Sequence, residues 1–178
     1  DIYSNEAYMK RYMEGLLISQ VIWSNHSKSF INFYKFIKGQ EKDFNYLEIG
    51  PGHGLYLALA AKSPKCISAE TWDISRESIR QTKASIERLE VTKKVSFKNC
   101  DILNNSLSKK NEFFNLIVIS EVLEHLEKPQ IALQNIKKLI ARDGILYINF
   151  PINSPSPDHI FLLKTVKEVE LLIINAGF

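Results

Sequence analysis

The segment Tyr46–Gly54, which reads YLEIGPGHG, constrains the fold more than any other part of this chain. An apolar run contains one carboxylate, Glu48, and glycines then occupy positions 50, 52 and 54. Glycine permits positive φ values and lets a backbone turn sharply or approach a ligand closely. A helix-forming stretch, Leu55–Ala61, follows at once. The segment therefore predicts a buried strand that turns tightly into a helix.

Strand-like and helix-like stretches alternate along the rest of the chain. Strands separated by helices of 10–15 residues are typical of right-handed βαβ units and a parallel sheet. We therefore predict an α/β fold, Rossmann-like and doubly wound, with a mostly parallel sheet and helices on both faces. The expected strands are Phe44–Ile49, Cys66–Trp72, Val95–Asn99 and Phe113–Ile119, and a turn at Asp143 and Gly144 leads into a fifth strand that Pro151 ends. The expected later helices are one capped by Ser75, one over 131–140 with Ala132, Ile136, Leu139 and Ile140 facing inward, and one over 165–175.

The first forty residues have helical periodicity, and Gly39 is a plausible stop. We predict a helical cap over 1–40 and a ligand-binding core over 41–178. The cap is rich in tyrosine and methionine, which favours core packing. The alternative is a lid that excludes water from a substrate pocket, with Tyr3, Tyr12 and Trp23 as its lining residues.

Composition excludes several classes of protein. The 178 residues carry a net charge of +3 with both signs interspersed, which does not favour a nucleic-acid or membrane surface. The sequence has no signal-peptide pattern and no apolar run near the roughly 20 residues of a membrane span. Cys66 and Cys100 are far apart, and we expect reduced thiols and a cytoplasmic location.

The glycine spacing separates two kinds of nucleotide site. A nicotinamide fingerprint reads G-x-G-x-x-G, whereas here Gly54 comes two residues after Gly52. The Glu48 carboxylate would repel a pyrophosphate and suits a ligand with an ammonium and a sulfonium. A nicotinamide-dependent oxidoreductase is therefore the disfavoured alternative.

The chain resembles class I S-adenosylmethionine (SAM)-dependent methyltransferases through five motifs in the family's order. LEIGPGHG is similar to the E/D-x-G-x-G-x-G loop, and WDIS, NCDI, ISEVLEHLEKP and DGILYINFP follow it. The resemblance implies that Asp73 binds the ribose hydroxyls and that Asp101 binds the adenine amine. The implied cofactor-binding residues are Glu48, Gly50, Pro51, Gly52, Gly54, Asp73, Ile74, Asp101, Ile102 and Ser120.

The same resemblance implies an activity and a strand count. The implied reaction is methyl transfer from SAM to a small molecule, most readily at a hydroxyl oxygen, as in the ubiquinone-pathway O-methyltransferases. An RNA 2′-O-methyltransferase and a catalytically inactive SAM-binding module are the alternatives, and a homodimer is left open. The family's sheet has seven strands, and its last two strands find no counterpart before Phe178.

A second group of candidate residues follows the fourth expected strand. Glu121, Glu124 and His125 form an E-x-x-E-H pattern, and they share one face if a helical turn starts at Glu121. With His159 they resemble the metal site of the small-RNA 2′-O-methyltransferases. The resemblance implies a divalent cation, Mg²⁺, Mn²⁺ or Zn²⁺, bound by all four, with Glu121, His125 and His159 as catalytic residues. A histidine general base without metal, and a structural or substrate-orienting role, are the alternatives.

Two further histidines are less informative. His53 lies inside the glycine run, where it has a structural role or faces the carboxylate end of the cofactor. His26 lies in the helical cap, and an ordinary surface or core histidine is expected there.

Overall fold

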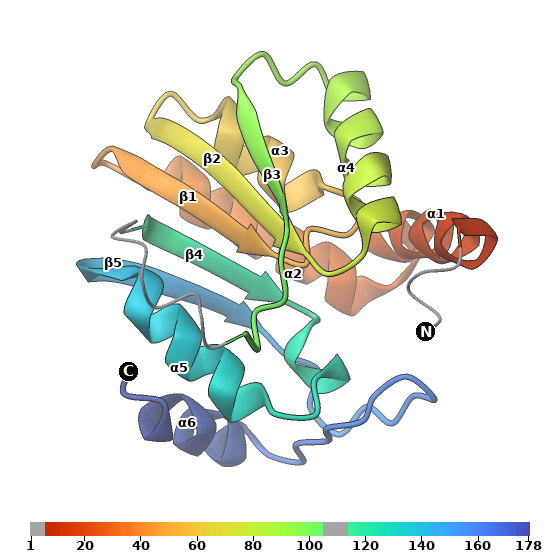
Figure 1. Ribbon diagram of the computed structural model, residues 1–178, viewed down its shortest axis with the longest axis vertical. Coiled ribbons are helices and arrows are strands. Elements are labelled where there is room, and N and C mark those ends of the chain that lie inside the picture. Colours follow the sequence, from red (N-terminus) through yellow and green to blue (C-terminus); the bar gives the residue numbers. More distant parts are fainter. Residues whose placement is uncertain (1–5, 105–113) are drawn as a thin grey trace. The chain divides into compact units, whose positions relative to one another are not determined.

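The computed structural model describes residues 6–104 and 114–178 (Figure 1). Tyr3, one of the expected lid residues, lies outside the described residues. The chain forms two compact units, Asp1–Cys100 and Asp101–Phe178, and each has its own strands and helices. The predicted division into a cap over 1–40 and a core over 41–178 stays a prediction.

The first unit is built on three parallel strands, β1 (Phe44–Ile49), β2 (Cys66–Asp73) and β3 (Val95–Asn99). The strand β2 lies between the other two, with Glu48 opposite Thr71 and Asp73 opposite Asn99. Helix α3 (Leu55–Lys62) connects β1 to β2, and helix α4 (Arg76–Arg88) connects β2 to β3. These are the βαβ units that the alternation of segments predicts.

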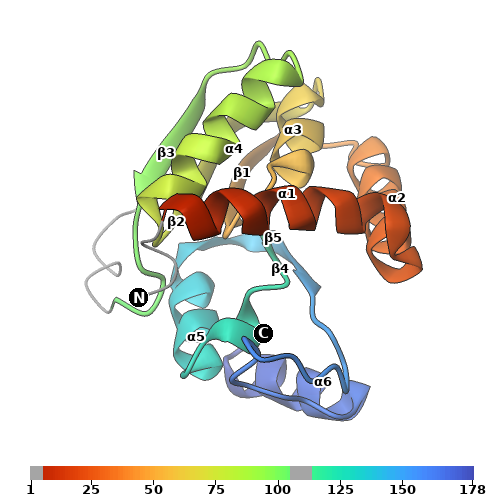
Figure 2. The same cartoon turned by 90° about the vertical axis from the view of Figure 1, so that its right-hand side faces the viewer.

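Two helices precede this sheet, α1 (Glu6–Ile22) and α2 (Ser24–Lys38). The helical conformation is interrupted between them at Trp23, which has an extended backbone with φ −90° and ψ 117°. Helix α1 contacts α4, and α2 contacts α3 (Figure 2). The helical prediction for the first forty residues is thus confirmed over the described part, as two helices rather than one.

The core of the first unit joins α2 to the sheet. Phe33 of α2, Tyr46 and Leu47 of β1, and Leu57 of α3 are completely buried. The ring of Phe33 stacks on that of Tyr56, with 4.4 Å between the centroids. Burial of apolar area at about 25 cal/mol per Å² makes such contacts the main stabilising term. This packing holds α2 against the helix that follows the glycine run.

The second unit pairs two parallel strands, β4 (Phe114–Ser120) and β5 (Ile140–Asn149), side by side in Figure 1. A short 3-10 turn, η3 (Leu123–His125), follows β4, and helix α5 (Pro129–Leu139) leads into β5. Helix α6 (Val166–Asn175) packs beside α5 and starts with a capping box between Thr165 and Glu168. The inward face of α5 is the expected one, with Ala132, Ile136 and Leu139 buried.

The fifth strand begins differently from the prediction. A turn was expected at Asp143 and Gly144, but β5 starts at Ile140, directly after α5. Its register against β4 shifts between Phe114 and Leu116, so Asp143 and Gly144 form an irregularity inside the strand instead of a turn before it. A Cβ at Gly144 would lie 2.7 Å from Cγ1 of Ile140, so only glycine fits the bend.

The predicted α/β class with parallel strands is confirmed. Five strands are described, fewer than the seven that the resemblance implies. Over residues 6–104 and 114–178, no helix combines the length and the apolar character needed to cross a membrane.

Candidate functional site

The glycine run forms the tight turn that the sequence predicts. Gly50, Gly52 and Gly54 all have positive φ, at 66°, 49° and 77°. The Thr82 hydroxyl of α4 donates to the carbonyl of Gly52 over 2.8 Å, which ties the loop to the helix behind it. A Cβ at Gly54 would lie 3.1 Å from Cγ2 of Thr82. The glycines therefore provide both the turn and the close approach of α4.

Glu48, at the end of β1, is buried rather than open to solvent. Only 3% of its surface is exposed, and the Tyr46 hydroxyl donates to its Oε2 over 2.8 Å. Burial raises the pKa of Glu48 to about 8, although the hydrogen bond from Tyr46 acts in the opposite direction. The contact of this carboxylate with a cationic ligand stays a prediction.

Asp73, at the end of β2, holds the start of α4. Its Oδ1 accepts from the backbone N–H of Ser75 over 2.8 Å, and its Oδ2 accepts from the Ser78 hydroxyl over 2.7 Å. Burial raises the pKa of Asp73, while these two hydrogen bonds lower it. Each carboxylate oxygen has a second lone pair, so the capping role leaves room for a ligand hydroxyl on the same group.

The other predicted cofactor residues are placed one by one. Ile74, in the first unit, is exposed. In the second unit, Asp101 is exposed and accepts from the backbone N–H of Leu103 over 2.8 Å, whereas Ile102 is buried. The Ser120 hydroxyl accepts from Nδ2 of Asn149 over 3.3 Å. Their contacts with a cofactor stay predictions.

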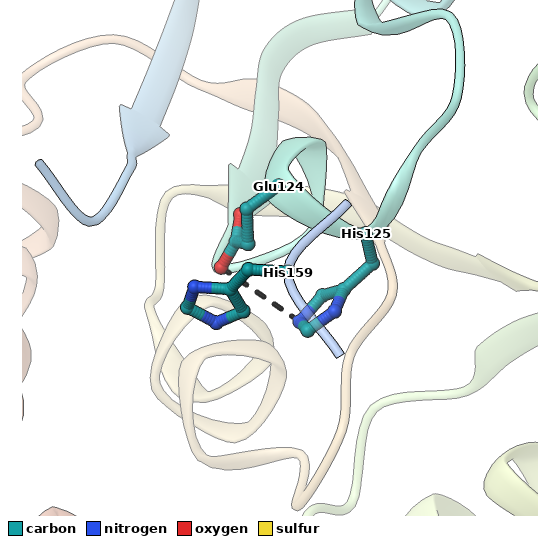
Figure 3. Close-up of side chains that lie close together, drawn as sticks. All are labelled: Glu124, His125 and His159. Carbon is teal, nitrogen blue, oxygen red and sulfur yellow. Dashed lines mark ion pairs between the residues drawn. The ribbon is translucent and has the colours of Figure 1, made fainter. Parts of the chain in front are cut away.

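Three of the four predicted metal-binding side chains converge in the second unit. Glu124, His125 and His159 each offer one ligand atom, and these atoms all lie within 4.8 Å of one another (Figure 3). Glu124 and His125 come from η3, and His159 comes from the segment after β5. The close-up shows the carboxylate and the two imidazole rings gathered at one point.

The hydrogen bonds of the two histidines determine which nitrogen is free. Nδ1 of His125 lies 2.8 Å from the carbonyl of Asp158, and Nδ1 of His159 lies 2.6 Å from the carbonyl of Ser154. A carbonyl oxygen can only accept, so both Nδ1 atoms carry the proton. In the neutral rings both Nε2 atoms therefore keep a lone pair. A backbone carbonyl on the distal N–H is also how metal-binding histidines are usually oriented.

Glu124 is the least satisfied group of this cluster. Its exposed fraction is 1%, and neither carboxylate oxygen accepts a hydrogen bond from the described residues around it. Nε2 of His125 lies 3.8 Å from Oε1 of Glu124. Burial and the charge of Glu121 raise the pKa of Glu124 to about 8, with a smaller contribution from Asp158, while a hydrogen bond from its own backbone N–H opposes the shift. A buried carboxylate without a partner from another residue is costly, so a cation bound here would stabilise it.

Glu121 lies outside the three-residue group. The helical turn that would place Glu121 on one face with Glu124 and His125 does not form, because Glu121 has φ 53° and η3 begins only at Leu123. The side chain is held by Asn149, whose Nδ2 donates to its Oε1 over 2.9 Å. Burial raises the pKa of Glu121, and the charge of His159 opposes the shift. Direct metal binding by Glu121 stays a prediction.

Comparison with known proteins identifies the family. A family model described as a methyltransferase domain matches residues 22–168. The chain belongs to the methyltransferase domain family. This membership agrees with the glycine loop and with the parallel strands on either side of α3.

The relatives of this methyltransferase domain are distant. Ubiquinone biosynthesis O-methyltransferase from Actinobacillus pleuropneumoniae serotype 7 (strain AP76) is 26% identical over 137 residues, which are 74% of this chain and 51% of the relative. The chain thus spans about half the length of the curated relative that it matches.

Solved structures show the same fold. The N-methyltransferase NodS from Bradyrhizobium japonicum WM9, in complex with S-adenosyl-L-homocysteine, matches with a TM-score of 0.65 and 22% identity, over 83% of this chain and 72% of its own. A SAM-dependent methyltransferase from Aquifex aeolicus matches with a TM-score of 0.67 and 17% identity, over 97% of this chain and 88% of its own. At these identities the likeness concerns the fold alone.

Some residues around the candidate metal-binding cluster could not be predicted from the sequence. Asp158 and Ser154 orient the two histidines through backbone carbonyls, which any residue type carries. Asn149 gives only a weak sequence signal, as a polar residue at the end of a strand.

The expected lid residue Trp23 is 61% exposed and its ring lies 5.0 Å from that of His26, while Tyr12 stacks on Tyr8. A lid function stays a prediction.

Proposed function

We propose that this chain transfers a methyl group from SAM to a hydroxyl oxygen of a small molecule. Family membership carries this proposal, because it covers most of the chain and includes the glycine loop. The choice of oxygen is supported by the curated relative, which is an O-methyltransferase, although the chain spans only half of that protein.

Residues of the first unit fit a cationic nucleoside. The left-handed backbone at Gly50 and Gly52 lets a ligand approach without a Cβ in the way. The free lone pairs of Asp73 can accept from two ribose hydroxyls. When bound, SAM supplies a methyl group on a positively charged sulfur. Methyl transfer would break the methyl–sulfur bond, leave the electron pair on sulfur and form a methyl–oxygen bond, and the hydroxyl proton would pass to water.

Glu124, His125 and His159, all in the second unit, would hold a divalent cation. The buried carboxylate without a partner from another residue supports this assignment, as do the two Nε2 atoms, which keep a lone pair in the neutral rings. Two nitrogen ligands suit Mn²⁺ or Zn²⁺ better than Mg²⁺, which prefers oxygen. When bound, such a cation lowers the pKa of a hydroxyl that it contacts. The backbone carbonyls of Asp158 and Ser154 orient the two histidine rings.

A second candidate mechanism uses the same geometry without a cation. The Nε2 lone pair of His125 or His159 could accept the hydroxyl proton directly. RNA as the acceptor is less well supported, because the net charge is only +3. A small-molecule acceptor, a cytoplasmic location and a homodimer stay predictions.

Calorimetry tests the two parts of the proposal separately. Wild type is titrated first with S-adenosylhomocysteine, then with Zn²⁺, Mn²⁺ and Mg²⁺. We expect binding of the nucleoside and of Zn²⁺ or Mn²⁺. Glu124→Gln should lose about tenfold or more in cation affinity and keep its affinity for the nucleoside.

The matched control is Glu127→Gln, which changes an exposed carboxylate three residues away. It should bind both ligands as wild type does. Absence of nucleoside binding to wild type would contradict the methyltransferase proposal. Equal cation affinities of wild type and Glu124→Gln would contradict only the cation site.

A further inference from the structure

Two imidazoles beside the glycine loop have no part in the function described so far. His53 lies between Gly52 and Gly54, and His26 lies on α2. Both belong to the first unit, and the charge of His26 acts on His53. Helix α1 also reaches the loop, since a Cβ at Gly52 would lie 3.6 Å from Cδ1 of Leu16. The α1–α2 pair and the loop therefore form one corner of this unit.

His53 presents a hydrogen-bond donor at this corner. The backbone N–H of Leu55 donates to Nδ1 of His53 over 3.2 Å, so this nitrogen is the acceptor of the ring. A neutral imidazole with an accepting Nδ1 carries its proton on Nε2. Burial lowers the pKa of His53 to about 4, so the ring is neutral at pH 7. Nε2 of His53 is thus an N–H donor.

His26 presents the opposite group. The Ser19 hydroxyl donates to the carbonyl of Leu16 over 2.7 Å, which uses its single hydrogen. Its oxygen lies 2.9 Å from Nδ1 of His26 and therefore accepts from that nitrogen. Nε2 of His26 then keeps its lone pair. Burial lowers the pKa of His26, which favours the neutral ring.

We propose that His53 and His26 recognise the amino-acid end of SAM, with Nε2–H of His53 donating to its carboxylate and Nε2 of His26 accepting from its ammonium. This inference rests on the proposed function. A carboxylate can only accept and an ammonium can only donate, so a donor on one ring and an acceptor on the other match this zwitterion, and the two rings are near enough for His26 to act electrostatically on His53. The ribose hydroxyls are donors and are matched by Asp73 instead.

A purely structural role makes a different prediction for chosen substitutions. In that role Nδ1 of His53 holds the loop, and Nδ1 of His26 joins α2 to α1 through Ser19. An asparagine amide can replace Nδ1, whereas a glutamine amide reaches the position of Nε2. His53→Asn and His26→Asn therefore keep the structural hydrogen bonds and remove the proposed ligand contacts. His53→Gln and His26→Gln keep the ligand contacts.

The experiment compares two ligands by calorimetry. S-adenosylhomocysteine carries the amino-acid zwitterion, and 5′-methylthioadenosine has the same adenosine and thioether without it. We expect His53→Asn and His26→Asn each to lower the affinity for S-adenosylhomocysteine by about tenfold, since hydrogen bonds to charged groups are stronger than those between neutral groups. Affinity for 5′-methylthioadenosine should stay unchanged. The glutamine variants should bind S-adenosylhomocysteine more tightly than the asparagine variants.

Other outcomes overturn the inference. Equal weakening of both ligands would mean that the histidines only support the loop, and unchanged binding of both would mean that they contact no ligand. Wild type that binds neither ligand would overturn the proposed function itself, which is a distinct result. Thermal unfolding of each variant identifies any that fails to fold, and the glutamine variant of the same histidine then decides.

Discussion

The hydroxyl of Tyr46 donates a 2.8 Å hydrogen bond to the carboxyl group of Glu48, inside the first unit and two residues before the first glycine of the loop. Both side chains come from β1 and are buried. The Thr71 hydroxyl, from the neighbouring strand β2, donates to the backbone carbonyl of Glu48 over 3.0 Å. The acid at the end of this strand is thus part of the core, and its protonation is coupled to folding.

Glu48→Gln should make folding less sensitive to alkaline pH. Burial raises the pKa of Glu48 from its ordinary 4.5 to about 8. The stability that comes from the protonated form is complete below pH 4.5 and is lost as the pH rises through 8. Between these values the free energy of unfolding of wild type should fall, relative to the variant, by about 1.4 kcal/mol per pH unit. Urea unfolding at pH 5, 7 and 9 measures this.

Glu87→Gln, at an exposed site on α4, is the control for that experiment and should follow wild type at all three pH values. Parallel stability curves for wild type and Glu48→Gln would show that this carboxyl does not titrate with folding.

Zn²⁺ should stabilise wild type against heat but leave Glu124→Ala unaffected. A ligand that binds only the folded state raises the unfolding midpoint with its concentration. Glu124 supplies the carboxylate that has no hydrogen bond, and its removal leaves two imidazoles, too few for tight binding. Differential scanning fluorimetry over a Zn²⁺ series measures the effect. The same shift in both proteins would place the bound cation elsewhere.

Gly54→Ala should destabilise the chain by about 1–3 kcal/mol, because the residue has φ +77° and the new methyl group would lie 3.1 Å from Cγ2 of Thr82. Gly15→Ala is the matched control. It lies inside α1 with no atom within 4 Å of its Cβ position, so alanine there should stabilise by about 0.5–1 kcal/mol. Chemical denaturation of both variants measures the difference. A tolerated alanine at position 54 would mean that the loop can rearrange.

Glu121→Gly should be more stable than Glu121→Ala by about 1 kcal/mol, because both variants lose the hydrogen bond from Asn149 and only glycine freely adopts the left-handed backbone with φ 53°. Glu121→Gly should also weaken Mn²⁺ binding, since the negative charge that it removes attracts a cation bound at Glu124, and the accompanying fall in the pKa of Glu124 offsets only part of this loss. Glu121→Gln separates the two effects, because it keeps the backbone strain and removes only the charge. Unchanged Mn²⁺ affinity in both variants would make Glu121 a purely structural residue.

The α/β class could be read from the chain because it depends on local periodicity. The apolar run Phe114–Ser120 indicates a buried strand, and the amphipathic pattern of α5 indicates a helix. Ser75 was expected to cap α4, and its hydroxyl accepts from the backbone N–H of Ser78. The alternation of these elements then leaves few topologies. The start of β5 was missed because Asp143 and Gly144 have the composition of a turn, and only pairing with β4 makes them a strand irregularity.

The candidate site was likewise only partly predictable from the sequence. The residue types and their spacing predicted the glycine loop, Asp73 and the pair Glu124–His125 as candidates, and the structure places Glu124 and His125 beside His159. Which nitrogen of His125 is free, whether Glu124 has a partner, and how Glu121 is turned depend on backbone carbonyls and on burial. Those are set by segments distant in the chain, such as the carbonyl of Asp158, and only the tertiary structure brings them together.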